Sequence, residues 1–119
     1  MAVEFEITDR KVDEDTHVIA VRGEIDLFTA PEFKQGVSAL IDAGRSRIVV
    51  DLTETTFIDS SSLGVLIGAH RRLKLRGGTL LVVCDSEAIA KTFKITGLDG
   101  VFTLASSVDA AVASSASAA

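Results

Sequence analysis

The sequence is poor in aromatic residues and in cysteine, and both shortages exclude classes of protein. Its 119 residues include six Phe but no Trp or Tyr, so it has few stacking platforms for single-stranded nucleic acid. The net charge of −5 also opposes binding to a polyphosphate, because that affinity comes from Lys and Arg. We therefore expect no nucleic-acid partner. The single Cys84 cannot build a disulfide framework and follows an apolar run, which predicts a small buried hydrophobe.

Long apolar runs are also absent. No stretch approaches the roughly 18 apolar residues of a membrane-spanning helix, and residues 1–15 alternate in polarity, unlike a signal peptide. The sequence therefore predicts a soluble, cytoplasmic protein without a membrane partner. Its composition, 47% hydrophobic and 24% charged, is typical of one globular domain. We predict that this domain covers 1–113 and that a Ser/Ala-rich tail over 114–119 is flexible.

Polarity patterns predict that strands and helices alternate along the chain. The predicted strands span residues 3–7, 17–22, 47–52, 79–84 and 101–104. The first two, joined by a short turn, are expected to pair antiparallel. Helical periodicity separates the later strands, and a last helix is expected at 108–113. This order indicates an α/β fold with a mixed, mostly parallel sheet of about five strands and helices packed against it.

The first predicted helix has explicit boundary signals. Thr29 and Glu32 fit a capping box, and Phe28 and Phe33 fit a hydrophobic staple across the same turn. Gly44 is placed to end the helix in the left-handed conformation. Functional loops of such folds lie outside the carboxyl ends of the strands. The polar stretches that follow the second and third strands, 23–26 and 53–60, occupy such positions.

The second of these stretches leads into Asp59-Ser60-Ser61-Ser62, immediately before a predicted helix. A serine hydroxyl is among the best N-caps, because it accepts a hydrogen bond from a free backbone N–H of the first turn. Asp59 also suits the positive end of the helix dipole. Capping requires only one such side chain, however, so four polar residues in a row indicate a further role.

A catalytic role for these serines lacks the necessary partners. No Gly-x-Ser-x-Gly motif surrounds them, and the two histidines, His17 and His70, are not placed by the sequence to act as a base. Asp51, at the end of an apolar strand, resembles the acceptor of a receiver domain, but the acidic residues that would hold its divalent cation match poorly. Gly77-Gly78 precedes a strand and opens no helix, which opposes a nucleotide loop. We expect no enzymatic activity, no metal and no cofactor.

Two segments together resemble the anti-anti-sigma factor family, the stand-alone STAS domains of bacteria. They are Gly23-Glu24-Ile25-Asp26 and Asp59-Ser60-Ser61-Ser62-Leu63-Gly64, and Gly97-Leu98 with Val101-Phe102 is similar to the family's terminal pattern. The resemblance implies an interaction protein that acts in partner switching during the stress response or sporulation. When unphosphorylated, it binds an anti-sigma factor with serine kinase activity and so releases a sigma factor. Phosphorylation ends the binding, and a serine phosphatase restores it.

The resemblance also implies which residues form the site. The phosphorylated residue is expected to be Ser60, because the family's acceptor is the first serine after the aspartate. The family usually has Gly at the position of Ser62, so this chain carries a third hydroxyl, and Ser61 is the runner-up acceptor. Glu24, Asp26, Asp59 and the three serines would contact the partner. Two other functions stay open: an interaction subunit of a lipid-transport or signalling assembly, and a sensor of a nucleotide or another small ligand.

Overall fold

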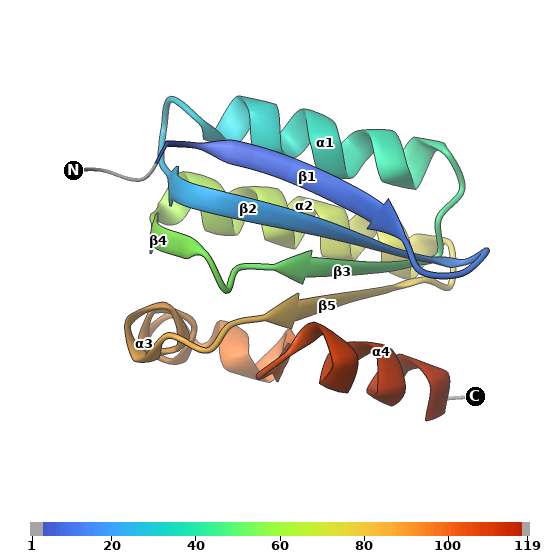
Figure 1. The fold of residues 1–119 in the computed structure, drawn as a ribbon. Coiled ribbons are helices and arrows are strands. Elements are labelled where there is room, and N and C mark those ends of the chain that lie inside the picture. The colour runs from blue at the N-terminus through green and yellow to red at the C-terminus, as the bar shows by residue number, and fades with distance from the viewer. Residues whose placement is uncertain (1–3, 118–119) are drawn as a thin grey trace.

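A six-stranded mixed sheet organises the chain in the computed structural model, which describes residues 4–117 (Figure 1). The strands are Glu6–Lys11 (β1), Thr16–Ile25 (β2), Arg47–Asp51 (β3), Thr55–Ile58 (β4), Thr79–Val83 (β5) and Thr103–Ala105 (β6). Their order is β1-β2-β3-β5-β6, and β4 pairs with the last part of β2. Only the β1–β2 pair among these is antiparallel. The predicted α/β fold with a mixed, mostly parallel sheet is confirmed.

The helices cover the two faces of the sheet unequally. They are Ala30–Asp42 (α1), Ser60–Leu75 (α2), Glu87–Ile95 (α3) and Val108–Ser117 (α4), with a short 3₁₀ turn at Leu98–Gly100. The first three share the larger hydrophobic core, which includes the fully buried Phe33, Leu66 and Phe93. α4 lies on the opposite face (Figure 1), where Ala111 packs with Val49 and other strand residues in a smaller cluster.

The sequence patterns misplaced several element boundaries. β1 occupies 6–11 where 3–7 was predicted, and residue 3 of that prediction lies outside the described part of the chain. β6 is Thr103–Ala105 where 101–104 was predicted, because Val101 ends the preceding 3₁₀ turn. α4 continues to Ser117, past the end at 113 that was predicted for the last helix, while residues 118–119 of the predicted tail lie outside the described chain.

β4 was predicted to be part of a loop and is a strand. β2 is ten residues long: its first half pairs with β3, and its last residues extend past the end of β3. The free edge left there accepts β4 in parallel, with Glu24 opposite Phe57 and Ile25 opposite Ile58. The buried Thr55 hydroxyl also donates to the Val21 carbonyl oxygen at 2.8 Å. This pairing joins segments far apart in the chain, so local polarity patterns do not reveal it.

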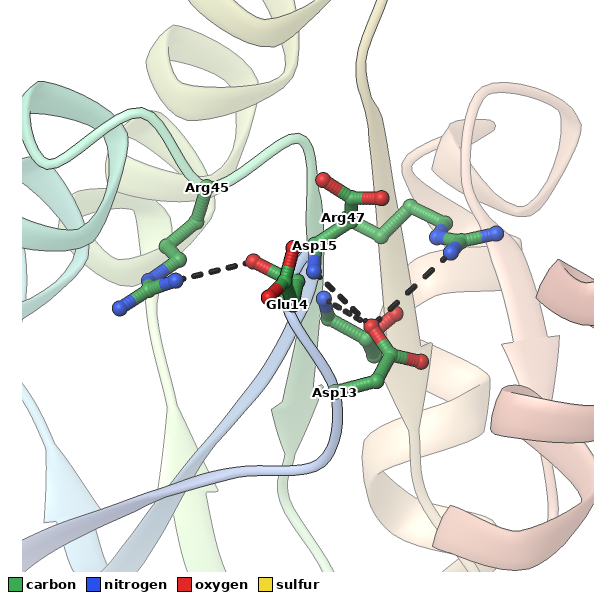
Figure 2. A network of polar contacts seen from close by, with 6 residues as sticks. Asp13, Glu14, Asp15, Arg45 and Arg47 are labelled. Atoms are coloured by element: carbon green, nitrogen blue, oxygen red, sulfur yellow. Dashed lines mark hydrogen bonds and ion pairs between the residues drawn. The ribbon is translucent and has the colours of Figure 1, made fainter.

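The turn between β1 and β2 is tied to the segment that leads into β3 (Figure 2). Asp13 Oδ1 accepts from the backbone N–H groups of Asp15 and Thr16, at 2.9 and 2.8 Å. Arg45 Nη1 donates to the Glu14 carbonyl oxygen at 2.9 Å. The backbone N–H of Arg47 donates to the Asp15 carbonyl oxygen at 3.0 Å. These bonds anchor the antiparallel hairpin at one end of the sheet. The carboxyl ends of β2 and β4 lie at the other end, to the left in Figure 1.

Candidate functional site

The pairing of β2 with β4 brings the two sequence motifs together. Ile25 and Ile58 are partners in this ladder, so Asp26 and Asp59, the next residues, leave the sheet side by side. The Ser62 hydroxyl adds a direct link, because it donates a hydrogen bond to the Ile25 carbonyl oxygen. The first residues of α2 and the loop after β2 therefore form one continuous surface at this end of the sheet.

Asp59 caps helix α2, a role that the sequence had suggested for a serine. Its Oδ1 accepts from the backbone N–H groups of Ser61 and Ser62, at 3.0 and 3.2 Å, and its own N–H donates to Ser62 Oγ at 3.2 Å. The result is a reciprocal capping box between Asp59 and Ser62. The prediction of a serine at the N-cap position was wrong, because the preceding carboxylate accepts the N–H groups of Ser61 and Ser62. A serine still takes part in capping, since Ser62 is the second member of the box.

The three serines occupy three different environments. Ser62 is fully buried, and its hydroxyl is committed to Ile25. Ser61 is half-buried, and its hydroxyl donates to the Asp59 carboxylate. Ser60 is exposed, and its hydroxyl has no hydrogen-bond partner among the described residues. Only Ser60 therefore presents a free, accessible hydroxyl at the start of the helix.

The loop between β2 and α1 is held by Asp26, and the predicted start of α1 was wrong in detail. Asp26 Oδ1 accepts from the N–H groups of Phe28 and Thr29, at 2.9 and 3.1 Å. Thr29 is the N-cap residue, but its hydroxyl points back toward the end of β2, where it donates to the Glu24 carbonyl oxygen at 2.8 Å. It consequently makes no capping bond, and the predicted box with Glu32 does not form.

Three apolar side chains around this surface are exposed, and the sequence patterns missed their importance. Phe28 is 88% exposed and forms no staple with the buried Phe33. Leu27, beside it, is 71% exposed, and Phe57 on β4 is 46% exposed. Large apolar side chains gathered on a surface indicate a site of protein–protein contact. In the sequence, these three residues lie next to the two acidic motifs, and this proximity could have identified them as candidate contact residues.

The hydrogen bonds around Asp59 also change its acidity. The Ser61 hydroxyl, followed by the backbone N–H groups of Ser62 and Ser61, stabilises the ionised form and lowers the pKa of the Asp59 carboxyl below its ordinary value. A depressed pKa in the folded state contributes stability at pH values above the unfolded-state pKa, near 3.9. This contribution is lost as the pH falls through the lower, folded-state pKa.

An Asp59→Asn variant should separate the stability contributed by capping from the stability that depends on ionisation of the Asp59 carboxyl. Asn is a comparably good N-cap, but it has no charge to titrate and makes weaker hydrogen bonds. We expect the wild type to be more stable than the variant at pH 7 by about 1 kcal/mol, and the difference to shrink below about pH 4. Urea denaturation followed by circular dichroism from pH 2.5 to 7 measures both curves. A difference that is constant with pH would contradict the assignment.

Among the residues that the structure describes, the two histidines have contacts away from the serines. His17 Nε2 lies 2.8 Å from Asp9 Oδ1 in the β1–β2 hairpin, and His70 packs edge-on against Phe102 with 5.4 Å between ring centroids. Burial raises the pKa of the Cys84 thiol, which lies in the larger core. Within residues 4–117, no three His, Cys, Asp or Glu side chains are grouped to hold a metal ion.

Comparison with known proteins identifies the family of this chain. A family model described as STAS domain matches residues 8–111, so the chain belongs to the STAS domain family. Anti-sigma-B factor antagonists are among its relatives. That of Listeria monocytogenes is 34% identical over 105 residues, covering 87% of this chain and 90% of the relative. That of Bacillus subtilis is 29% identical over 104 residues, covering 87% and 94%.

Solved structures of similar proteins extend the comparison to the fold. An anti-sigma factor antagonist from Mycobacterium paratuberculosis superposes with a TM-score of 0.81 at 27% identity, covering 95% of this chain and 93% of that one. The Bacillus cell fate determinant SpoIIAA in its phosphorylated form has a TM-score of 0.70 at 25% identity, covering 92% and 96%. None of the helices described over 4–117 combines the length and apolar content needed to cross a membrane.

Proposed function

We propose that this protein is a cytoplasmic anti-sigma factor antagonist switched by phosphorylation of Ser60. In its unmodified form it binds an anti-sigma factor that is also its serine kinase, and this binding releases a sigma factor. Phosphorylation breaks the complex, and a serine phosphatase restores it. The protein itself catalyses no reaction. The observation that carries the proposal is the free, exposed Ser60 hydroxyl at the start of α2, next to Asp59 and close to the end of β2.

The choice among the three serines rests on access. A kinase must bring the acceptor oxygen to the γ-phosphate of ATP, so a buried hydroxyl would first require local unfolding. Ser62 is fully buried and donates to Ile25. Ser61 remains the runner-up, because it is half-buried and its hydroxyl is bound to Asp59. Ser60 meets neither obstacle.

The surroundings of Ser60 explain how a phosphate would act on binding. A phosphate brings about −1.5 to −2 charges at pH 7. The N–H groups of Ser61 and Ser62, which could have accommodated it, already donate to Asp59. The phosphate would therefore project outward beside the Asp59 and Asp26 carboxylates. A partner surface that accepts a neutral hydroxyl there would have to desolvate this charge without a counter-ion.

The exposed apolar residues supply the rest of the docking surface. Leu27, Phe28 and Phe57 flank the acidic motifs, and such residues are the usual anchors of a protein interface. Glu24, Asp26 and Asp59 add polar contacts at its rim. A surface that mixes large apolar anchors with a modifiable hydroxyl suits a reversible protein partner better than a nucleotide or another small ligand.

Phosphopeptide mapping of the protein from its native host, during growth and under stress, tests the proposal. We expect phosphate on Ser60, with an occupancy that changes between the two conditions. Co-purification with the unmodified protein should recover an anti-sigma factor. An unmodified serine cluster in every condition would overturn the switch. Recovery of a membrane transporter as the tight partner would assign the domain to another assembly of the STAS class.

A further inference from the structure

A groove between α1 and α2 adjoins the proposed docking surface. Its volume is about 590 Å³. Its lining includes buried apolar side chains of both helices, Val37 and Ile41 of α1 and Ala69 of α2. Ser61 lines the groove as well and donates to Asp59. The groove is therefore continuous with the start of α2, where Ser60 lies.

The charges along this groove are of one sign, although the protein is acidic overall. Lys34, Arg71 and Arg72 line it, and no carboxylate does, in a chain whose net charge is −5. Arg72 pairs with Asp42. Lys34 and Arg71 are exposed and have no ion-pair partner among the described residues. The groove thus offers two uncompensated cations to a negatively charged occupant.

Two glycines of α2 line this groove and contribute no side chains to it. Gly64 and Gly68 lie one turn apart on the exposed side of the helix and line the groove. A Cβ atom placed at either position would meet no atom within 4 Å, so packing inside the domain does not require glycine. Glycine destabilises a helix interior relative to alanine. Its use here allows another backbone to approach closely.

We infer that this groove receives a helix of the anti-sigma partner that carries acidic side chains; the inference rests on the proposed function and names a second contact of the same complex. From Ser61 to Arg72, α2 extends about 16 Å, enough to seat three turns of a partner helix. The glycines admit that helix closely, the apolar floor accepts its hydrophobic side chains, and Lys34 and Arg71 pair with its carboxylates. The partner is thereby held at two adjoining places, of which only the first contains Ser60.

Binding of purified variants to the anti-sigma factor of the native host, followed by calorimetry, tests this second contact. Gly68→Leu fills the groove, and Arg71→Glu reverses one of its charges. We expect each to raise the Kd at least tenfold without lowering the melting temperature, because neither residue is packed inside the domain. Gly68→Leu should raise the melting temperature, since leucine is the better helix former. Lys91→Glu is the matched control, since Lys91 is exposed on α3 and does not line the groove. It should change the Kd less than twofold.

Each alternative outcome has a distinct meaning. Wild-type affinity of Gly68→Leu and Arg71→Glu, together with weak binding of Ser60→Glu, would overturn the second contact and leave the proposed function intact. Wild-type affinity of Ser60→Glu as well would overturn the proposed function itself. Self-association in sedimentation velocity that Gly68→Leu abolishes would assign the groove to a second copy of this chain and overturn the inference. Flotation with phosphatidylglycerol vesicles that Arg71→Glu abolishes would assign it to anionic lipid, with the same consequence.

Discussion

Replacing Ser60 with Glu is expected to weaken binding of the anti-sigma partner at least 100-fold without unfolding the domain. A 100-fold change corresponds to about 2.7 kcal/mol of binding free energy. The introduced carboxylate would lie beside Asp59, which already accepts the N–H groups of Ser61 and Ser62. These two donors are therefore not available to the new charge, which would be buried without an ion-pair partner on binding. Because Ser60 is exposed, the free energy of unfolding should change by no more than about 0.5 kcal/mol.

Ser60→Ala is the matched control for this experiment. It removes the acceptor hydroxyl without adding charge, so it should bind the partner within a few-fold of the wild type and should resist phosphorylation by the kinase. Calorimetric titration of the three proteins gives the affinities, and urea denaturation gives the stabilities. Equal affinities of Ser60→Glu and Ser60→Ala would show that charge at this position does not control binding. Strong destabilisation of Ser60→Glu would instead mean that the variant binds weakly because it is partly unfolded.

Replacing Ser62 with Glu, in contrast, is expected to lower the stability of the folded domain. Ser62 is 0% exposed, and its hydroxyl joins Ile25 to the start of α2. A glutamate there would place a longer, charged side chain in the core, next to the Asp59 carboxylate that it would repel. We expect Ser62→Glu to lose at least about 3 kcal/mol of stability, a large part of the total for a domain of this size.

Ser62→Ala provides a measurable intermediate if the glutamate variant does not fold. It leaves the Asp59 N–H without its side-chain partner and deprives the Ile25 carbonyl oxygen of a donor. The expected cost is about 1–3 kcal/mol. Denaturation followed by circular dichroism should order the stabilities as wild type, Ser62→Ala, Ser62→Glu. Wild-type stability of Ser62→Glu would mean that this position opens to solvent in solution, and it would make Ser62 an accessible hydroxyl like Ser60.

The local patterns that succeeded are those with a strong periodic or conformational signal. The helical period of 30–42 was recognised because buried residues such as Phe33 and Val37 recur on one face. Gly44 ends this helix with φ of +86°, a conformation that glycine adopts readily. Buried β3 and β5 were recognised as continuous apolar runs between turn signals. Each of these signals lies within a few residues of the element that it predicts.

The predictions that failed at the start of α1 depended on the path of the chain between β2 and the helix. Thr29 fits a capping box by spacing, but its hydroxyl donates to the Glu24 carbonyl oxygen at the end of β2. Phe28 fits a staple by spacing, but it is exposed in the folded chain. The spacing of residues in the sequence shows which hydrogen bonds can form at the start of a helix. Which of them does form depends on the conformation of the preceding loop.

The sequence by itself determined the alternation of strands and helices, the boundaries marked by glycine, and the two motifs that resemble a known family. These features depend on side-chain periodicity and on residues whose backbone preferences act locally. Only the tertiary structure decided that the two motifs lie together, because their meeting requires the parallel pairing of β2 with β4. It also decided which of three consecutive serines has a free hydroxyl, since that depends on the burial of Ser62 against Ile25 and on the cap formed by Asp59.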